Sequence, residues 1–266
     1  MTTKDIHLSL LSQYKLPTMK FLQNNKLRKQ LMYNEDAIEV VIKTDEKDAE
    51  YIEEICEEIT DLIIDIIKYK ILKEYVLKHY SDTYENEKED IYIHSLNLFN
   101  EKELFIRDTV LSRVCDYVLS NDYLNLDGFV KFRMKEFMNF IPALGDMALE
   151  EYLMQKDQDE FISVLKYFIE IQEEKIDLLR VHIRNDNSFM LYDKDGNKIN
   201  SIDDEEIINM VIKENLNYED FLISTLLTLC PKKIEIRDSL KDNCSKEIIE
   251  TIKSIFGNRV SEIRPN

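Results

Sequence analysis

The chain of 266 residues carries 53 acidic side chains against 35 lysines and arginines, which leaves a formal net charge of −18. This balance argues against a general nucleic-acid-binding role, because neutralising phosphates requires a basic surface. Apolar residues make up 44% of the chain, enough for a substantial core, yet the longest nearly uncharged apolar run, 221–231, falls far short of the ~20 residues of a membrane-spanning helix, so a soluble protein is expected.

The first 34 residues are locally basic, with six lysines or arginines and a single acid, Asp5. One interpretation is that this segment packs against the acidic remainder of the chain, where each exposed ion pair contributes little. The alternative is contact with an anionic membrane or an acidic partner, which polybasic segments support. Pro17 interrupts the apolar residues of 6–32, so we expect short irregular or helical pieces there.

Residues 37–43 have the pattern of a strand, because the β-branched residues Ile38, Val40 and Ile42 recur with a period of two. In 45–80, apolar side chains recur three and four residues apart, which predicts a long amphipathic helix. Further helices are expected over 89–97 and 101–119, the second with Leu104 facing inward. The N-terminal region, residues 1–122, is therefore predicted to be mainly helical with one strand.

The C-terminal region, residues 123–266, opens with a segment rich in aromatic residues. We expect a helix that starts at Gly128 and buries Phe129 and Phe132, with a boundary at Pro142. Short helices are then expected over 145–154 and 157–171. In the second of these, Phe161 and Phe168 are assigned to the core because of their helical spacing.

The period changes to two after residue 175, which indicates strands over 179–183 and 189–192. Asp195 and Gly196 predict a tight hairpin turn, so we expect a small antiparallel meander. Asp203 followed by Glu206 resembles a capping box, and Asn217 is placed to cap another helix over 218–230.

The end of the chain has the pattern of a β-α-β unit. A strand over 233–236, a helix over 245–256 and a strand over 260–263 leave a crossover long enough for parallel pairing. The predicted fold class is therefore α+β: mainly helical, with an N-terminal strand and a small mixed C-terminal sheet made of the meander and this unit.

Common catalytic signatures are absent. With four glycines in the chain, neither GxGxxG nor GxxxxGK[ST] occurs, and GxSxG and HExxH are missing too. The loop 193–204 resembles a calcium-binding loop only in part, because its glycine falls two residues early, and a hairpin tip is favoured. The four cysteines have no CxxC spacing, which favours a reduced, cytoplasmic protein. The sequence predicts no cofactor and no metal, and leans against an enzyme.

Two groups of polar residues near the aromatic segments are candidates for a ligand or partner site. Arg133 stands between apolar residues of a predicted helix, where a buried guanidinium requires an internal partner or an anionic ligand. A second group could serve in general acid–base catalysis or metal binding: the carboxylates of Glu170, Glu173 and Glu174, with Lys175 as a charge partner. A solvated helix end is the structural alternative for them.

A third candidate group follows the predicted strand over 233–236. Arg237, Asp238 and Ser239 lie just past it, at the place where open α/β sheets usually bind ligands. A polar turn at the edge of a small sheet explains the same residues without a function.

One stretch has the character of a family signature. It opens with Asp-Gly-Phe-Val-Lys-Phe-Arg-Met-Lys at 127–135 and closes with Tyr-Phe-Ile-Glu-Ile-Gln-Glu-Glu-Lys-Ile-Asp at 167–177. It resembles the YtxC-like sporulation protein family, and the likeness continues through 222–229, 231–234 and 248–256, roughly the C-terminal half. The resemblance implies a cytosolic protein of spore-forming Gram-positive bacteria, and it transfers no catalytic residue to this chain.

An interaction or scaffold role in sporulation is the favoured function, with a protein partner, no nucleic acid and no transmembrane segment. One alternative is an enzyme that uses acidic residues in metal-assisted or acid–base chemistry. Another is peripheral association with an anionic membrane through residues 1–34. A deep pocket that encloses Arg133 with two of the carboxylates favours the enzyme, whereas an acidic surface with one apolar patch favours a partner-binding module.

Overall fold

The computed structural model describes residues 5–11, 14–23, 27–33, 37–43, 49–184, 188–199, 218–239 and 243–263. The predicted caps at Asp203 and Asn217 lie outside these residues. The chain divides into two compact units, Met1–Met154 and Gln155–Asn266. The sequence-based boundary at residue 122 differs from this division, because the strand and the aromatic segment that follow it pack into the core of the first unit.

The first unit contains a four-stranded mixed sheet of order β2-β3-β1-β4. Its strands are β1 (Ile6–Leu11), β2 (Lys29–Tyr33), β3 (Ala37–Ile42) and β4 (Tyr123–Asn125), and α1 (Lys15–Gln23) connects the first two. β3 pairs antiparallel with β1 and β2, whereas β4 lies parallel to β1. The predicted strand is confirmed as β3. The expectation of irregular or helical pieces over 6–32 is right for α1 and wrong for β1 and β2, and β4 was not predicted.

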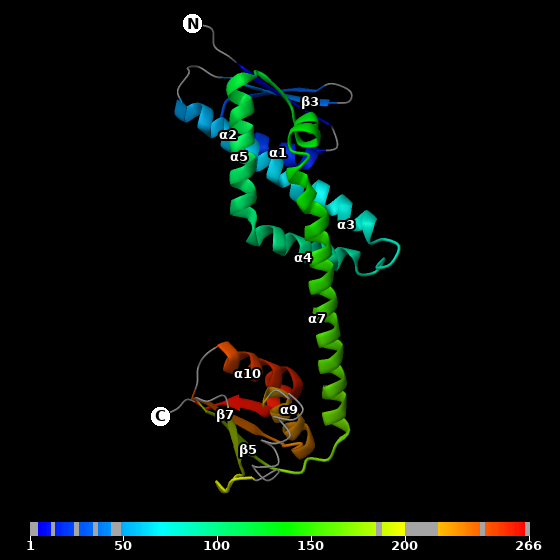
Figure 1. The fold of residues 1–266 in the computed structure, drawn as a ribbon, viewed down its shortest axis with the longest axis vertical. Helices are drawn as coiled ribbons and strands as arrows, with labels where there is room; N and C mark the ends of the chain where they lie inside the picture. The colour runs from blue at the N-terminus through cyan, green and yellow to red at the C-terminus, as the bar shows by residue number, and fades with distance from the viewer. Residues whose placement is uncertain are drawn as a thin grey trace. The chain divides into compact units, whose positions relative to one another are not determined.

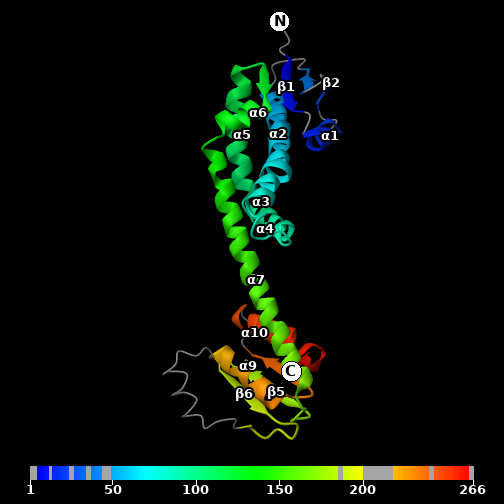
Figure 2. The same ribbon diagram turned by 90° about the vertical axis from the view of Figure 1, so that its right-hand side faces the viewer.

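A long helical run lies against this sheet (Figure 1). It consists of α2 (Ala49–Ile66), the π-helical segment η2 (Ile67–Leu72) and α3 (Lys73–His79), followed by α4 (Lys88–Glu101) and α5 (Glu103–Ser120). α5 packs against α2, as Figures 1 and 2 show. These elements confirm the three helices expected over 45–119, but Leu104 is 81% exposed rather than inward.

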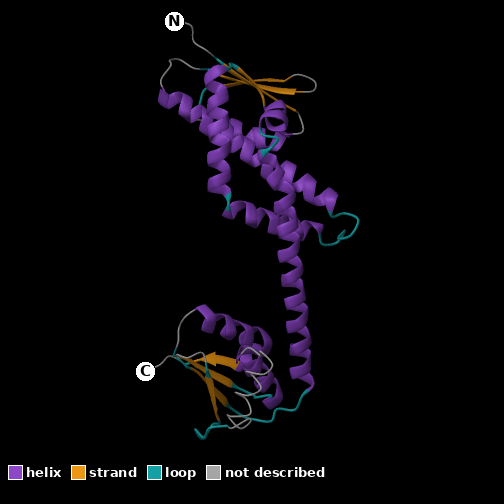
Figure 3. Ribbon diagram, viewed as in Figure 1, coloured by secondary structure: helices purple, strands orange, loops and turns teal. Residues whose placement is uncertain are grey.

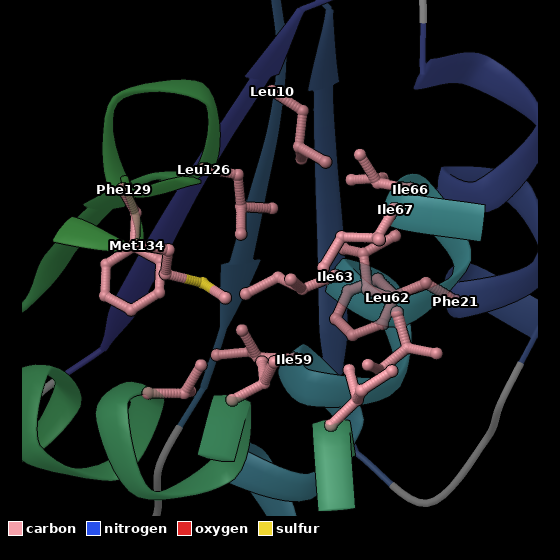
Figure 4. Close-up of a cluster of buried hydrophobic side chains, with 14 of the residues drawn as sticks. Leu10, Phe21, Ile59, Leu62, Ile63, Ile66, Ile67, Leu126, Phe129 and Met134 are labelled. Atoms are coloured by element: carbon pink, nitrogen blue, oxygen red, sulfur yellow. The ribbon is translucent and has the colours of Figure 1, made fainter. Parts of the chain in front are cut away.

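The core of the first unit forms between the sheet and the helices. Ile59, Ile63 and Ile66, three and four residues apart on α2, are all buried, as their spacing predicts. Figure 4 shows them gathered with Leu10 of β1 and Phe21 of α1. Since burying such a side chain contributes about 1.5–3 kcal/mol, this contact joins α2 firmly to the sheet.

The basic start of the chain is partly paired with acids of α2. Lys20 Nζ lies 2.8 Å from Asp65 Oδ2, and Lys29 forms an ion pair with Glu58 in which both side chains are buried. Lys29 Nζ also donates a hydrogen bond of 2.6 Å to the carbonyl of Phe21 and lies over its ring. These contacts are of the kind expected if the segment packs on the acidic body.

The segment after β4 differs most from expectation. Instead of one helix from Gly128, the chain forms α6 (Leu126–Gly128), the π-helical turn η3 (Phe129–Arg133) and the 3-10 turn η4 (Phe137–Asn139). α7 (Phe140–Ile171) is then one helix where two were predicted. Pro142 lies in its first turn, where the missing N–H is not required and a proline is tolerated.

The second unit is built on a four-stranded sheet of order β6-β5-β7-β8 (Figure 3). The strands are β5 (Leu179–Ile183), β6 (Phe189–Tyr192), β7 (Ile234–Asp238) and β8 (Val260–Glu262), with helices α9 (Tyr218–Leu229) and α10 (Asn243–Phe256) and the 3-10 turn η5 (Gly257–Arg259). β5 is antiparallel to β6 and parallel to β7, which is parallel to β8. The predicted hairpin and β-α-β unit are confirmed.

Local turn chemistry explains the hairpin end of this sheet. Gly196 has a φ of +86°, and Asp193 Oδ1 accepts hydrogen bonds from the backbone N–H groups of Asp195 and Asn197. The hydrogen bond from Asn197 Nδ2 to Asp193 Oδ2, together with these backbone bonds, lowers the pKa of Asp193. The carboxylate therefore stabilises the turn, as a hairpin tip requires.

Among the residues whose conformation is described, no helix combines the length and the apolar character needed to cross a membrane.

Candidate functional site

The segment 125–135 begins with a compact turn fastened to β1. Asn125 Oδ1 accepts a hydrogen bond of 2.7 Å from the backbone N–H of Gly128, and Asp127 Oδ2 accepts one of 3.0 Å from that of Leu11. A Cβ at Gly128 would lie only 3.0 Å from Asn125 Oδ1, so the turn leaves little room for a side chain. The two polar residues thus position the start of η3.

The wider spacing of the π-helical turn places two apolar side chains in the core. The backbone N–H of Met134 donates to the carbonyl of Phe129, five residues earlier, at 3.2 Å. Phe129 and Met134 are both buried, and Figure 4 shows them beside the side chains of α2. Part of the family-like segment therefore serves packing, as its apolar pattern predicted.

Of the four residues between them, Val130 is half-buried, whereas Lys131, Phe132 and Arg133 are exposed, which corrects two expectations. Phe132, assigned to the core, is 72% exposed. Arg133, expected within an apolar helix, is also exposed: its backbone carbonyl accepts a 2.9 Å hydrogen bond from Arg113 Nη1, and its guanidinium carbon lies 6.0 Å from the centre of the Tyr117 ring. The cause is the π-helical turn, because a periodicity other than 3.6 redistributes side chains between the two faces.

An open cavity of about 600 Å³ lies beside η3. Ile71 of η2 and Val130, Lys131 and Phe132 of η3 line it, so both π-helical segments of the first unit border the same space. Because π-helical turns are rare and occur frequently at functional sites, this coincidence marks the cavity as the best candidate site in the first unit. Lys131, Phe132 and the nearby Lys135 are exposed.

The glutamates and lysine around the end of α7 belong to the second unit, and two of them have structural partners. Glu174 Oε1 lies 3.7 Å from Arg259 Nη2, and Lys175 Nζ donates a hydrogen bond of 2.9 Å to the carbonyl of Thr228. Glu170 and Glu173 are exposed, and α7 ends at Ile171, between them. The shared helical face proposed for Glu170 and Glu173 is therefore absent.

Arg237 and Asp238, predicted to follow the strand, are the last two residues of β7, and Ser239 comes directly after it. Arg237 and Ser239 are exposed, and the backbone N–H of Ser239 donates to the carbonyl of Ile183 at 3.1 Å. Arg237 stands opposite His182 in the pairing of β5 with β7. Burial lowers the pKa of His182, and the charges of Arg237 and Arg180 lower it further. Arg133 belongs to the first unit, so the candidate groups are divided between the two units.

The second half of α7 carries an exposed apolar surface that is not predicted from the sequence. Phe161, Val164, Phe168 and Ile171, here called the α7 stripe, are 59%, 63%, 42% and 63% exposed. The assignment of Phe161 and Phe168 to the core is wrong, because Ile162, Leu165 and Ile169 take that place on the neighbouring face. The aromatic spacing was visible in the sequence, but two apolar faces on one helix leave open which one is buried.

Together these features define a mainly helical α+β protein with two small mixed sheets. Among the described residues, no three histidine, cysteine or acidic side chains lie close enough to hold a metal ion.

A model of the YtxC-like family matches residues 53–261, and the chain belongs to that family, which confirms the resemblance. It is 22% identical over 167 residues to the protein of Bacillus subtilis (strain 168) named "Uncharacterized protein YtxC". That match covers 61% of this chain and 56% of the relative, so it spans little more than half of the relative's length. No solved structure was found to match the chain.

Proposed function

We propose that this protein is a cytoplasmic interaction protein of sporulation, which binds a protein partner through the α7 stripe. The single observation that carries the proposal is the exposure of four large apolar side chains on one helix. Contiguous exposed apolar surface is uncommon on soluble proteins and usually marks an interaction site. The sporulation setting comes from the family resemblance, and the cytoplasmic one from the cysteine pattern.

The spacing of the stripe suits a helical partner. Phe161, Val164, Phe168 and Ile171 follow one another at intervals of three, four and three, which is the a/d spacing of a coiled-coil seam. A second helix buries such a seam by inserting its own apolar side chains between these four. We therefore infer an amphipathic helix as the binding element of the partner.

The charge around the stripe indicates the polar character of that helix. Asp157 and Glu160 are exposed just before Phe161, and the whole chain has a net charge of −18. Complementary charge accelerates association and suppresses wrong partners. The partner helix is therefore expected to carry lysines or arginines beside its apolar face.

A catalytic role has less support. Arg133 and the carboxylates named with it are divided between the two units, and Glu174 and Lys175 already bond to groups of the second unit itself.

The test is affinity capture of the tagged full-length protein from sporulating cells, followed by mass spectrometry. The double variant Phe161→Gln/Val164→Gln removes the first half of the stripe and retains good helix formers. A protein that is enriched with the wild type and lost with this variant is the expected result. Recombinant wild type and variant are then compared for binding to that protein.

The matched control is Lys166→Gln/Glu170→Gln, which changes two exposed residues of the same helix outside the stripe. It should retain the partner, and both double variants should keep the thermal midpoint of the wild type. No enrichment at any time during sporulation, or equal capture by both double variants, contradicts the proposal.

A further inference from the structure

The cavity beside η3 is mainly apolar on the inside. Leu11 of β1, Ile71 of η2, Val130 of η3 and Met138 of η4 contribute apolar side chains to its lining. Its volume of about 600 Å³ falls within the range of ~300–1,000 Å³ that is typical of small-molecule pockets. The interior thus suits an apolar ligand of small size.

The charged residues of the lining leave one net positive charge. They are Asp127, Lys131 and Lys135, and the Asp127 carboxylate already accepts the backbone N–H of Leu11. Within the part of the chain that the structure describes, neither lysine forms an ion pair; Lys131 Nζ lies 5.6 Å from the centre of the Phe132 ring. In a protein of net charge −18, such a local positive excess selects a ligand with one negative charge.

The polar atoms of the lining disfavour a polypeptide ligand. A bound peptide would bring N–H groups that need acceptors, and an unpaired buried N–H is costly. Asn125 Oδ1 and Asp127 Oδ2 each accept one hydrogen bond within the fold, from the backbone N–H groups of Gly128 and Leu11, which reduces the acceptors left for a peptide. A hydrocarbon chain brings no such groups, so its burial incurs no comparable penalty.

We propose that this cavity binds a single-chain fatty carboxylate. The alkyl chain lies against Ile71, Val130 and Met138, and the carboxylate accepts charge-assisted hydrogen bonds from Lys131 and Lys135. Phe132, which is 72% exposed next to these lysines, packs on the part of the chain near the head group. This site lies in the first unit and is independent of the α7 stripe.

The experiment is a fluorescence titration of the full-length protein with cis-parinaric acid, followed by competition with lauric acid and with lauryl alcohol. Saturable binding that lauric acid reverses, and that the uncharged alcohol reverses at least about tenfold less well, is expected, because the alcohol has no charge to pair with the lysines. Vesicles of phosphatidylglycerol and of phosphatidylcholine form a separate arm, measured by co-sedimentation.

Two variants locate the site. Lys131→Gln/Lys135→Gln should weaken binding on the order of tenfold, while Lys78→Gln/Lys102→Gln, two exposed lysines of the same unit outside the cavity, should leave it unchanged. Val130→Phe fills the cavity and should abolish binding; its circular dichroism melt shows whether the fold is retained.

The proposal is overturned by any of three results: no saturable binding, equal affinity of the two lysine double variants, or equal competition by acid and alcohol. Binding to phosphatidylglycerol vesicles without binding of the monomeric fatty acid would also overturn it, in favour of a membrane contact. Phe161→Gln/Val164→Gln should bind the fatty acid like the wild type, so failure of this site and failure of the α7 stripe are told apart.

Discussion

The two units each pair a basic with an acidic side chain across their sheet or core, but in different surroundings. In the first unit, the side chains of Lys29 and Glu58 are only 4% and 6% exposed. In the second, Arg180 Nε lies 2.9 Å from Glu235 Oε2, and the two side chains are 35% and 29% exposed. The ion pair of the first unit is thus shielded from water, whereas that of the second unit is in contact with it.

This difference teaches how burial sets the role of an ion pair. Two buried charges depend on each other, since neither has water to solvate it when its partner is removed. A half-exposed pair exchanges its partner for water at little cost. The first unit is therefore expected to be sensitive to changes at the pair, and the second tolerant of them.

The largest predicted loss of stability comes from breaking the buried ion pair between Lys29 and Glu58. Lys29→Met leaves the Glu58 carboxylate buried without its partner and should destabilise the first unit by about 3–5 kcal/mol. Arg180→Met, the matched change in the second unit, should cost at most about 1 kcal/mol. Urea unfolding followed by circular dichroism measures both.

A second substitution separates the charge from the packing. In Lys29→Met/Glu58→Met no charge is left buried, so most of the lost stability should return. If Lys29→Met costs no more than Arg180→Met, or the double variant is no better than the single one, the distinction between the two units is wrong.

A smaller loss of stability is expected when Gly145 or Gly196 is replaced by alanine, and the physical reason differs between the two positions. A Cβ at Gly145, in α7, would lie 2.9 Å from Tyr75 Cε1 and 3.2 Å from the Tyr80 hydroxyl, whereas at Gly196 nothing lies within 4 Å but φ is +86°. Gly145→Ala should cost about 1–3 kcal/mol through overpacking, and Gly196→Ala about 1–2 kcal/mol through backbone strain.

The two glycine variants should also regain stability through different further substitutions. Adding Tyr75→Leu should relieve Gly145→Ala, because the contact at 2.9 Å disappears. Gly196→Asn should be milder than Gly196→Ala, since asparagine tolerates positive φ. Thermal unfolding of the four variants checks this, and a Gly145→Ala protein as stable as the wild type would show that α7 shifts to make room.

The smallest effect concerns the pH dependence of the second unit. The pKa of His182 lies below its ordinary value of 6.5, chiefly because of burial and then because of Arg237 and Arg180. The unfolded chain therefore binds a proton more readily, so the contribution of neutral His182 is full above pH 6.5 and is lost as the pH falls from there to the folded pKa. His182→Gln should lose less stability over that interval; an unchanged pH profile contradicts the assignment.

The two sheets also differ in how far the sequence predicts them. In β5 the apolar residues alternate with arginine and histidine, and the burial alternates with them, so the strand was predicted. In β1, Ile6, Leu8 and Leu10 alternate in sequence with His7 and Ser9, although Ser9 is buried too. This signal was available but weak, because leucine is no strong strand former. β2 begins with Lys29, whose side chain is buried although lysine predicts exposure. β4 has three residues, too few to show a periodicity.

The candidate site was predicted only in part. The segment 127–135 was singled out from the sequence, and in the structure Lys131 and Lys135 lie on its exposed side. The π-helical turn was not foreseeable from a helical pattern, so Phe132 was placed inside and the significance of Arg133 was overstated. Ile71 and Leu11 could not be joined to this segment, because more than fifty residues separate each of them from Lys131.

The sequence by itself determined the properties that depend on local interactions. Spacings of three and four specified the helices between residues 49 and 120, a period of two specified β5, and Asp195 with Gly196 specified a turn, because each depends on neighbours close in the chain. Only the tertiary structure decided which apolar face of α7 is buried, which lysine lies inside and which residues surround the cavity. Those outcomes depend on contacts between distant segments, where one packing arrangement excludes another.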